Sequence, residues 1–258
     1  MFIKYLFLSV IYSIMENLVK SDTNTVQPKV QPKVQPIKSR LVNVSFYITY
    51  AFLLTTGTIT FIEALRNKVP AIRHILNLET CISIVAAFFY SQFMKKVNDA
   101  TKEGKEINFR EINMTRYTDW MITTPIMILV LCLVLGYNNN TTVRADFFLL
   151  LLLVNFAMLA AGYVGEVGIT TRKVGGGLGF VFFFLLYGLI YSRYLAGNYN
   201  FDNQIIFWAF TVFWAFYGVF YYLDEKTKNV GYNVLDLFSK CFVGIFFWAY
   251  LTGVIKIF

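Results

Sequence analysis

The sequence predicts an all-α fold, a bundle of seven membrane-spanning helices. Hydrophobic residues make up 57% of its 258 residues and charged residues only 15%, whereas soluble domains carry about 25% charged residues. The hydrophobic residues also fall in seven long blocks, and a helix that crosses a bilayer needs roughly 20 such residues. Because main-chain polar groups in lipid must bond to one another, each block is predicted to be helical.

The predicted helices are joined by short polar connections, which favours a single compact bundle. The blocks cover roughly residues 43–65, 75–97, 113–136, 144–164, 175–196, 203–223 and 230–256. We therefore expect one domain over residues 42–258.

Residues 1–41 are expected to stand apart from this domain. Residues 1–14 are apolar behind Lys4 but too short to span a bilayer, which indicates a signal-like or interfacial segment. Three of the five prolines follow in a repeat of Gln-Pro-Lys-Val type. Proline at every fourth position excludes a helix and favours a solvated tether, so residues 1–40 are expected to be poorly ordered.

The net charge of +8 does not indicate nucleic-acid binding, because lysine and arginine lie between the apolar blocks rather than in one basic surface. The three cysteines lie inside apolar blocks and match no metal-binding spacing, so no metal site is expected.

Of the 23 basic residues, 14 lie on the amino-terminal side of the membrane and 6 on the other. That count favours a cytoplasmic amino terminus, whereas a signal-like segment at residues 1–14 favours an extracellular one.

Five ionisable residues lie at membrane depth. Placing a charge there costs about 3 kcal/mol or more of free energy, so such residues face a charged partner or a water-filled cavity. They are Glu79, Arg116, Asp119, Asp236 and Lys240. Asp236 and Lys240 are four residues apart, and Arg116 and Asp119 three apart, so each pair shares a helix face. A structural ion-pair cluster is one interpretation. The other starts from Lys240, because a desolvated lysine is a nucleophile toward an aldehyde and the resulting cation needs a carboxylate beside it.

Three motifs then identify a family. Their sequences are Arg116-Tyr117-x-Asp119-Trp120-x-x-Thr123-Thr124-Pro125, Trp214-x-x-Tyr217 with Tyr221, and Asp236-x-x-x-Lys240. With these motifs on its third, sixth and seventh helices, the chain resembles the microbial, or type I, rhodopsins over about residues 42–256. Viral and algal members of that family look similar.

The resemblance implies that all-trans retinal is bound as a Schiff base on Lys240. It implies that Asp119 is the primary counter-ion and proton acceptor, that Asp236 is the second counter-ion, and that Arg116 steers the released proton outward. Thr123 would hydrogen-bond Asp119, and Tyr90 would bond near Asp236. The residues expected to line the polyene are Trp120, Thr124, Met127, Met158, Gly162, Trp214, Tyr217 and Tyr221. Any single aromatic residue among them also suits an ordinary core.

The sequence departs from the family's proton pumps at Val130, where those pumps often carry a carboxylate donor. Gly218 and Asn155 also replace residues common in the family. Glu79 is a candidate substitute donor, since it lies about 16 Å of helix from Tyr90 toward the cytoplasm. The alternative is a hydrated helix end near His74.

The resemblance implies a multi-pass membrane protein with an extracellular amino terminus, and not an enzyme. The expected function is outward light-driven transport of protons. A light-gated channel for small cations is the alternative, and a photosensor is a third. Related proteins also lead us to expect a homo-oligomer, a trimer or pentamer, in the lipid bilayer.

Overall fold

The computed structural model describes residues 37–197 and 199–257. The predicted signal-like segment and most of the proline-rich tether lie outside the described residues. The first described helix begins at Ile37, so residues 37–41, which the sequence interpretation assigned to the tether, are helical. The tether boundary was therefore placed too late.

The described residues form seven long helices with no strand among them, as the sequence predicts. The first six are α2 (Ile37–Arg66), α3 (Pro70–Lys102), α4 (Phe109–Asn138), α5 (Ala145–Glu166), α6 (Arg172–Tyr194) and α7 (Phe201–Phe220). The seventh has three parts, namely α8 (Glu225–Asp236), the π-helical segment η1 (Leu237–Phe242) and α9 (Val243–Leu251). All seven are long and apolar enough to cross a membrane.

Several helices are longer than their apolar blocks. The helix α3 begins at Pro70, five residues before the predicted start, and continues to Lys102. Proline is favoured in the first turn because its missing N–H has no partner there. The 33 residues of α3 extend for about 50 Å, longer than the roughly 30 Å hydrocarbon layer. Hydrophobicity marks the part of a helix in the hydrocarbon layer, whereas the hydrogen-bonded helix continues into water.

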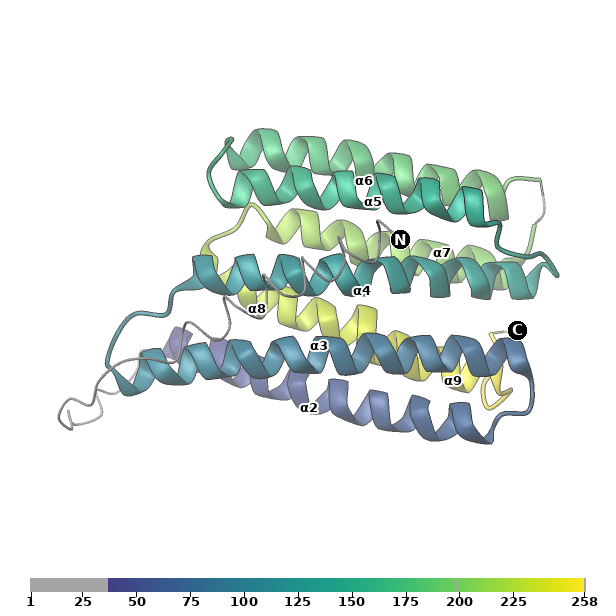
Figure 1. The fold of residues 1–258 in the computed structure, drawn as a ribbon, viewed down its shortest axis with the longest axis horizontal. Helices are drawn as coiled ribbons and strands as arrows, with labels where there is room; N and C mark the ends of the chain where they lie inside the picture. The colour runs from purple at the N-terminus through teal and green to yellow at the C-terminus, as the bar shows by residue number, and fades with distance from the viewer. Residues whose placement is uncertain (1–36, 198, 258) are drawn as a thin grey trace, which may run out of the picture. The chain divides into compact units, whose positions relative to one another are not determined.

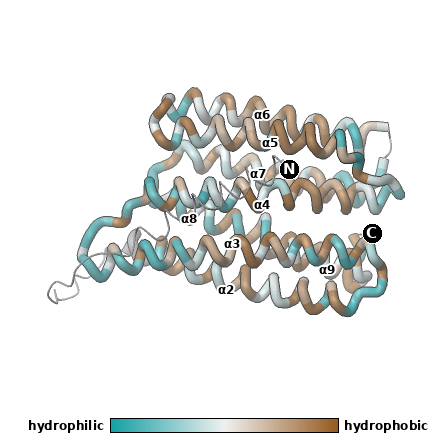
Figure 2. Tube along the Cα trace, viewed as in Figure 1, coloured by the Kyte–Doolittle hydropathy of each residue, from teal (hydrophilic) through white to brown (hydrophobic). Residues whose placement is uncertain are grey.

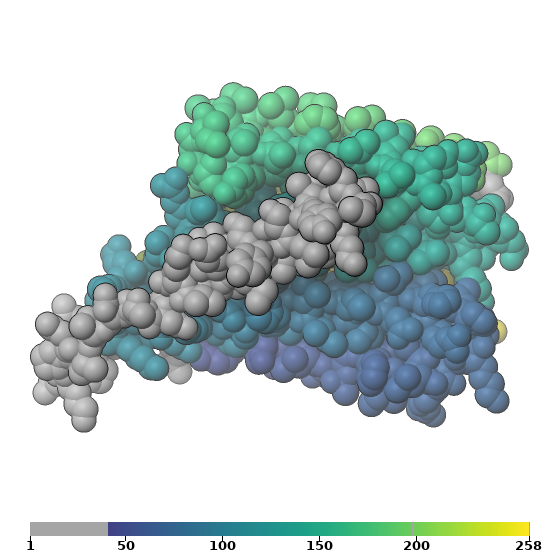
Figure 3. Space-filling model, in the orientation of Figure 1, coloured from purple at the N-terminus to yellow at the C-terminus, as the bar shows by residue number. Residues whose placement is uncertain are grey.

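The helices lie side by side with their axes roughly aligned (Figure 1). The pair α5 and α6 forms one edge of the bundle and the pair α2 and α3 the other, as the space-filling view also shows (Figure 3). Between them lie α4, α7 and the seventh helix. Apolar residues dominate the helix middles and polar residues gather at the ends (Figure 2). Large apolar side chains such as Leu65, Leu153 and Phe184 are more than 65% exposed, which suits a surface in contact with lipid.

The seventh helix changes its winding in the middle of the bundle. The segment Leu237–Phe242 is π-helical and contains Lys240. A π-helix is wider than an α-helix, with hydrogen bonds to the fifth residue along, and it occurs mostly at functional sites. No residue type in this stretch signalled it, because it contains neither proline nor glycine. Asp236 thus lies at the start of this wider turn, and Lys240 lies within it.

Candidate functional site

The centre of the bundle holds a buried cation between two buried carboxylates. Lys240 is 1% exposed, and Asp119 and Asp236 are fully buried. The Lys240 Nζ atom donates to Asp119 Oδ2 at 2.8 Å and lies 3.4 Å from Asp236 Oδ1. The two pairs that the sequence placed on separate helix faces therefore meet at one point. At this depth the carboxylates stabilise a charge that lipid alone would exclude.

Asp236 is held in place by two tyrosines from different helices. Tyr90 on α3 donates to Asp236 Oδ2 at 2.7 Å, and Tyr217 on α7 donates to Oδ1 at 2.6 Å. The Tyr217 hydroxyl is also 2.8 Å from Ser239 Oγ. Because both carboxylate oxygens accept hydrogen bonds from buried hydroxyls, the negative charge on Asp236 is stabilised.

Asp119 has a different environment. Its Oδ1 atom has no hydrogen-bond partner among the described residues. Thr123, which the sequence interpretation expected to bond Asp119, donates at 2.9 Å to the main-chain oxygen of Asp119 rather than to its carboxylate. The Asp119 carboxylate is therefore less fully hydrogen-bonded than the Asp236 carboxylate.

Arg116 lies one turn from Asp119 on α4, on the side of the bundle where the amino-terminal end of α2 lies. Its Nη2 atom donates to Asn233 Oδ1 at 2.8 Å, and Nη1 lies 3.5 Å from Asp236 Oδ2. Four aromatic rings surround its guanidinium at 4.9 to 5.8 Å, those of Phe46, Tyr90, Phe93 and Tyr232. This enclosure combines ion pairing with attraction to ring faces.

A cavity begins at Lys240 and runs between α4, α5, α6 and α7. All eight residues expected to line a polyene face it, whereas Tyr90 does not. The complete lining is Tyr117, Trp120, Thr124, Met127, Met158, Leu159, Gly162, Gly176, Gly179, Phe180, Phe183, Trp214, Tyr217, Gly218, Tyr221, Tyr232 and Lys240. Flat aromatic and apolar walls with one amine suit a rigid conjugated chain with an aldehyde end. The residues present therefore fit retinal.

Glycines shape the cavity wall. A β-carbon on Gly162 would lie 2.6 Å from the Tyr117 hydroxyl oxygen, and one on Gly218 would meet the ring of Phe180. Sequence reasoning noted Gly218 only as a departure from the family and missed Tyr117 and Phe180. The signal for Tyr117 was available, since it lies inside the third-helix motif. Phe180 could not be chosen among 27 phenylalanines.

Thr124 lines the cavity and is also held by hydrogen bonds to two neighbouring residues. Its hydroxyl donates to the Trp120 main-chain oxygen at 2.7 Å, and Asn155 Nδ2 donates to it at 2.9 Å. Asn155, the second departure from the family, thereby joins α5 to α4. Trp120 also meets the ring of Tyr217 edge to face at 5.6 Å. These contacts hold one wall of the cavity rigid.

Glu79 is buried in the half of the bundle opposite Arg116. It lies nine residues inside α3 and is 2% exposed, which contradicts the interpretation of a hydrated helix end near His74. Its Oε2 atom lies close to the main chain of Gly244 on α9, where a β-carbon would be 3.1 Å away. Glu79 therefore belongs to the bundle interior.

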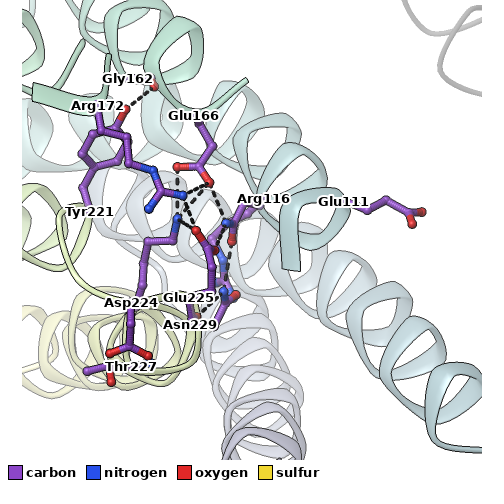
Figure 4. Close-up of polar contacts among 12 residues, drawn as sticks. Glu111, Arg116, Gly162, Glu166, Arg172, Tyr221, Asp224, Glu225, Thr227 and Asn229 are labelled. Carbon is purple, nitrogen blue, oxygen red and sulfur yellow. Dashed lines mark hydrogen bonds and ion pairs between the residues drawn. The ribbon is translucent and has the colours of Figure 1, made fainter. Parts of the chain in front are cut away.

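A second charged cluster, which we call the outer cluster, lies beyond Arg116 (Figure 4). It consists of Glu166, Arg172, Glu225 and Lys228, with Asn113 and Asn229 attached. Lys228 is fully buried, and its Nζ atom donates to Glu166 Oε1 at 2.8 Å and Glu225 Oε1 at 3.0 Å. Arg172 pairs with both glutamates. Two carboxylates thus neutralise two cations.

The outer cluster is connected to the centre by side-chain amides. Arg116 Nη2 lies 3.4 Å from Asn229 Oδ1, and Asn229 Nδ2 donates to Asn113 Oδ1 at 3.0 Å. Asn113 Nδ2 in turn donates at 2.7 Å to Glu166 and to Glu225. A surface cleft lined by both glutamates begins there. Sequence reasoning missed the outer cluster, because its members and the attached amides come from four separate helices.

Tyr221, in the connection between α7 and α8, closes the cavity near this cluster. Its hydroxyl donates to the Gly162 main-chain oxygen at 2.9 Å. Burial, together with the charge of Glu166, raises the pKa of Tyr221 to about 12. The phenol is therefore neutral near pH 7 and acts as a hydrogen-bond donor.

Comparisons with known proteins agree with this geometry. Residues 40–254 match the family model described as bacteriorhodopsin-like protein. The crystal structure of viral rhodopsin OLPVRII is similar, with 51% sequence identity and a TM-score of 0.77 over 84% of this chain and all of that chain. The green-light absorbing proteorhodopsin of Gamma-proteobacterium EBAC31A08 is 26% identical over 81% of this chain and 86% of that protein. Opsin-1 of Neurospora crassa is 25% identical over 81% of this chain and 75% of that protein. The chain therefore belongs to the microbial rhodopsins, the bacteriorhodopsin-like family of retinal-binding membrane proteins that transport ions or signal in response to light.

Proposed function

We propose that this protein binds all-trans retinal as a Schiff base on Lys240 and exports protons when illuminated. The observation that carries the proposal is the 2.8 Å contact between Lys240 Nζ and Asp119 Oδ2. It joins a nitrogen at the cavity to a carboxylate with one oxygen that lacks a partner among the described residues. That arrangement provides a proton donor and a nearby acceptor. Proton pumps among the structural relatives support the same function.

The retinal, when bound, supplies absorption of light and a change of shape. The chain supplies the proton path. Lys240 Nζ gives its proton to Asp119 Oδ2, while Tyr90 and Tyr217 keep both oxygens of Asp236 hydrogen-bonded. Arg116 then faces one charged carboxylate, Asp236, instead of two. The positive charge of Arg116 keeps protons from returning through the outer half of the bundle.

The outward route leads from Arg116 through Asn229 and Asn113 to the outer cluster. The cleft beside Glu225 opens at that end of the bundle. On the inner side, Glu79 is the carboxyl group that returns a proton to Lys240. It packs against Gly244 on α9, four residues beyond Lys240 in the chain.

The direction of transport requires the amino terminus to be extracellular. The count of basic residues on that side includes Lys228, but this residue is buried between two glutamates and is not a loop charge. The count of basic residues therefore favours a cytoplasmic amino terminus less strongly. We expect the protein to form a homo-oligomer, a trimer or pentamer, in the bilayer.

Recording light-induced current against voltage tests the proposed function. A pump produces outward current at zero driving force, and the outside medium acidifies in the light until a protonophore is added. Asp119→Asn should lower this proton current by about a hundredfold or more, because the acceptor is lost. Asp146→Asn is the matched control, since Asp146 is exposed at the start of α5, and it should leave the current unchanged.

Current that reverses with the cation gradient would identify a light-gated channel and contradict the proposal. Undiminished acidification by Asp119→Asn would remove Asp119 as the acceptor.

A further inference from the structure

The inner side of Lys240 contains a glycine in contact with a buried carboxyl group. Gly244 follows Lys240 by four residues and is buried in α9. A β-carbon on Gly244 would lie 2.9 Å from the methyl carbon of Thr56 and 3.1 Å from Glu79 Oε2. Real β-carbons rarely approach other atoms so closely. The Glu79 carboxyl group therefore packs directly on the main chain of the seventh helix, about one helical turn from Lys240.

Two small polar side chains lie beside this contact. Cys241 is fully buried next to Lys240 in the chain, and Thr56, which adjoins Gly244, is also buried. The Thr56 hydroxyl group and the Cys241 thiol are thus both buried near Gly244, which Cys241 precedes by three residues.

Polar groups also mark the same region of α2 and α3. Thr60 and Thr80 are buried, with hydroxyl oxygens 2.8 Å apart. Ser83, one turn along α3 from Glu79, is buried, and its hydroxyl has no partner among the described residues. Buried hydroxyls without partners are uncommon because they cost free energy. Glu79 is therefore one member of a polar strip between α2, α3 and α9.

We propose that Gly244 is a positioning residue that admits the Glu79 carboxyl group to the inner side of Lys240, and that Thr56 and Cys241 complete the route between them. The proposal rests on the proposed function. The proton leaves Glu79 Oε2 and arrives at Lys240 Nζ, and the resulting Glu79 carboxylate takes a proton from the cytoplasmic side. Glycine allows the carboxyl group to approach the main chain this closely, because a β-carbon at position 244 would push the carboxyl group away from it.

The first test compares Gly244→Ala with Gly188→Ala. Gly188 also lies within a spanning helix, but a β-carbon there meets nothing within 4 Å. After a flash, Gly244→Ala should recover its visible absorption about ten- to a hundredfold more slowly, because the carboxyl group is misplaced. Proton transfer from Lys240 to Asp119 should keep its rate. Azide, a small weak acid that can carry protons into the bundle, should restore fast recovery. Gly188→Ala should match the unmodified protein throughout.

The second test separates positioning from a general loss of packing. If Gly244 acts through Glu79, adding Gly244→Ala to Glu79→Gln should produce no further slowing. Infrared spectra of the retinal-free protein provide a readout independent of transport. The carboxyl band that Glu79→Gln removes should move in Gly244→Ala and stay in place in Gly188→Ala.

Recovery at the same rate in both alanine variants would overturn the role of Gly244, as would additive slowing with Glu79→Gln or an unmoved carboxyl band. Failure of the proposed function is a separate result. An unmodified protein that moves no protons outward contradicts the pump, whereas the infrared band still decides whether Gly244 positions Glu79.

Discussion

Lys240→Ala should remain colourless when retinal is added, and light should then drive no current. Of the described lysines, Lys228 and Lys240 are both buried, yet only Lys240 lines the cavity. The visible colour of a retinal protein requires a protonated imine with a carboxylate beside it. Alanine removes the amine and leaves Asp119 and Asp236 without their cation. The measurement is the visible absorption spectrum after purification with retinal.

The control must show that the variant still folds. Far-ultraviolet circular dichroism should report the same helix content in Lys240→Ala as in the unmodified protein. Lys256→Ala, which changes an exposed lysine beyond α9, should colour normally. Borohydride reduction of the illuminated unmodified protein should attach a retinyl group to the peptide that contains Lys240. A retinyl group on Lys228 would contradict the assignment of Lys240.

Lys228→Ala should lower the free energy of unfolding by about 3 to 5 kcal/mol, because it removes the buried cation beside the Glu166 carboxylate and leaves only the partly exposed Arg172 to balance two glutamates. Lys228 donates three hydrogen bonds to Glu166 and Glu225, at 2.8 to 3.1 Å. The side chain of Glu166 is itself only 2% exposed, so its charge depends on partners within the protein. The midpoint of thermal unfolding in detergent measures the effect, and colour should be lost at lower temperature.

Two further variants show whether uncompensated charge is the cause. Combining Lys228→Met with Glu166→Gln removes one charge of each sign, so it should destabilise the protein less than Lys228→Ala alone. Arg144→Gln breaks an exposed ion pair with Asp146 and should change the midpoint little, because exposed ion pairs contribute little. Equal losses from Lys228→Ala and from the double variant would exclude the charge explanation.

The sequence was sufficient to predict the seven helices and which buried charges share a helix face. Hydrophobic length identifies a spanning helix because the bilayer sets that length. The spacing of Arg116 with Asp119, and of Asp236 with Lys240, places each pair on one helix face. Charges at that depth must find partners inside the bundle, and the structure brings the two pairs together.

The outer cluster could not be predicted in the same way. Glu166, Arg172, Glu225 and Lys228 lie at or near helix ends, where charged residues are common and hydrophobic spacing carries no information. Which of them meet depends on how α5, α6 and α8 approach one another. The surroundings of Glu79 could not be predicted from the sequence either, because they depend on a close approach between α3 and α9 at Gly244.

The wider turn around Lys240 has a consequence for which residues share a side of the seventh helix. In a regular α-helix, eight residues rotate the chain by about 800°, so that Asp236 and Gly244 would point roughly 80° apart. The π-helical stretch between them rotates less per residue, because it holds more residues in each turn. The smaller rotation brings the side of the helix at Asp236 and the side at Gly244 closer to the same direction. One continuous helix can therefore direct both Asp236, on the side of Arg116, and Gly244, on the side of Glu79, into the interior of the bundle.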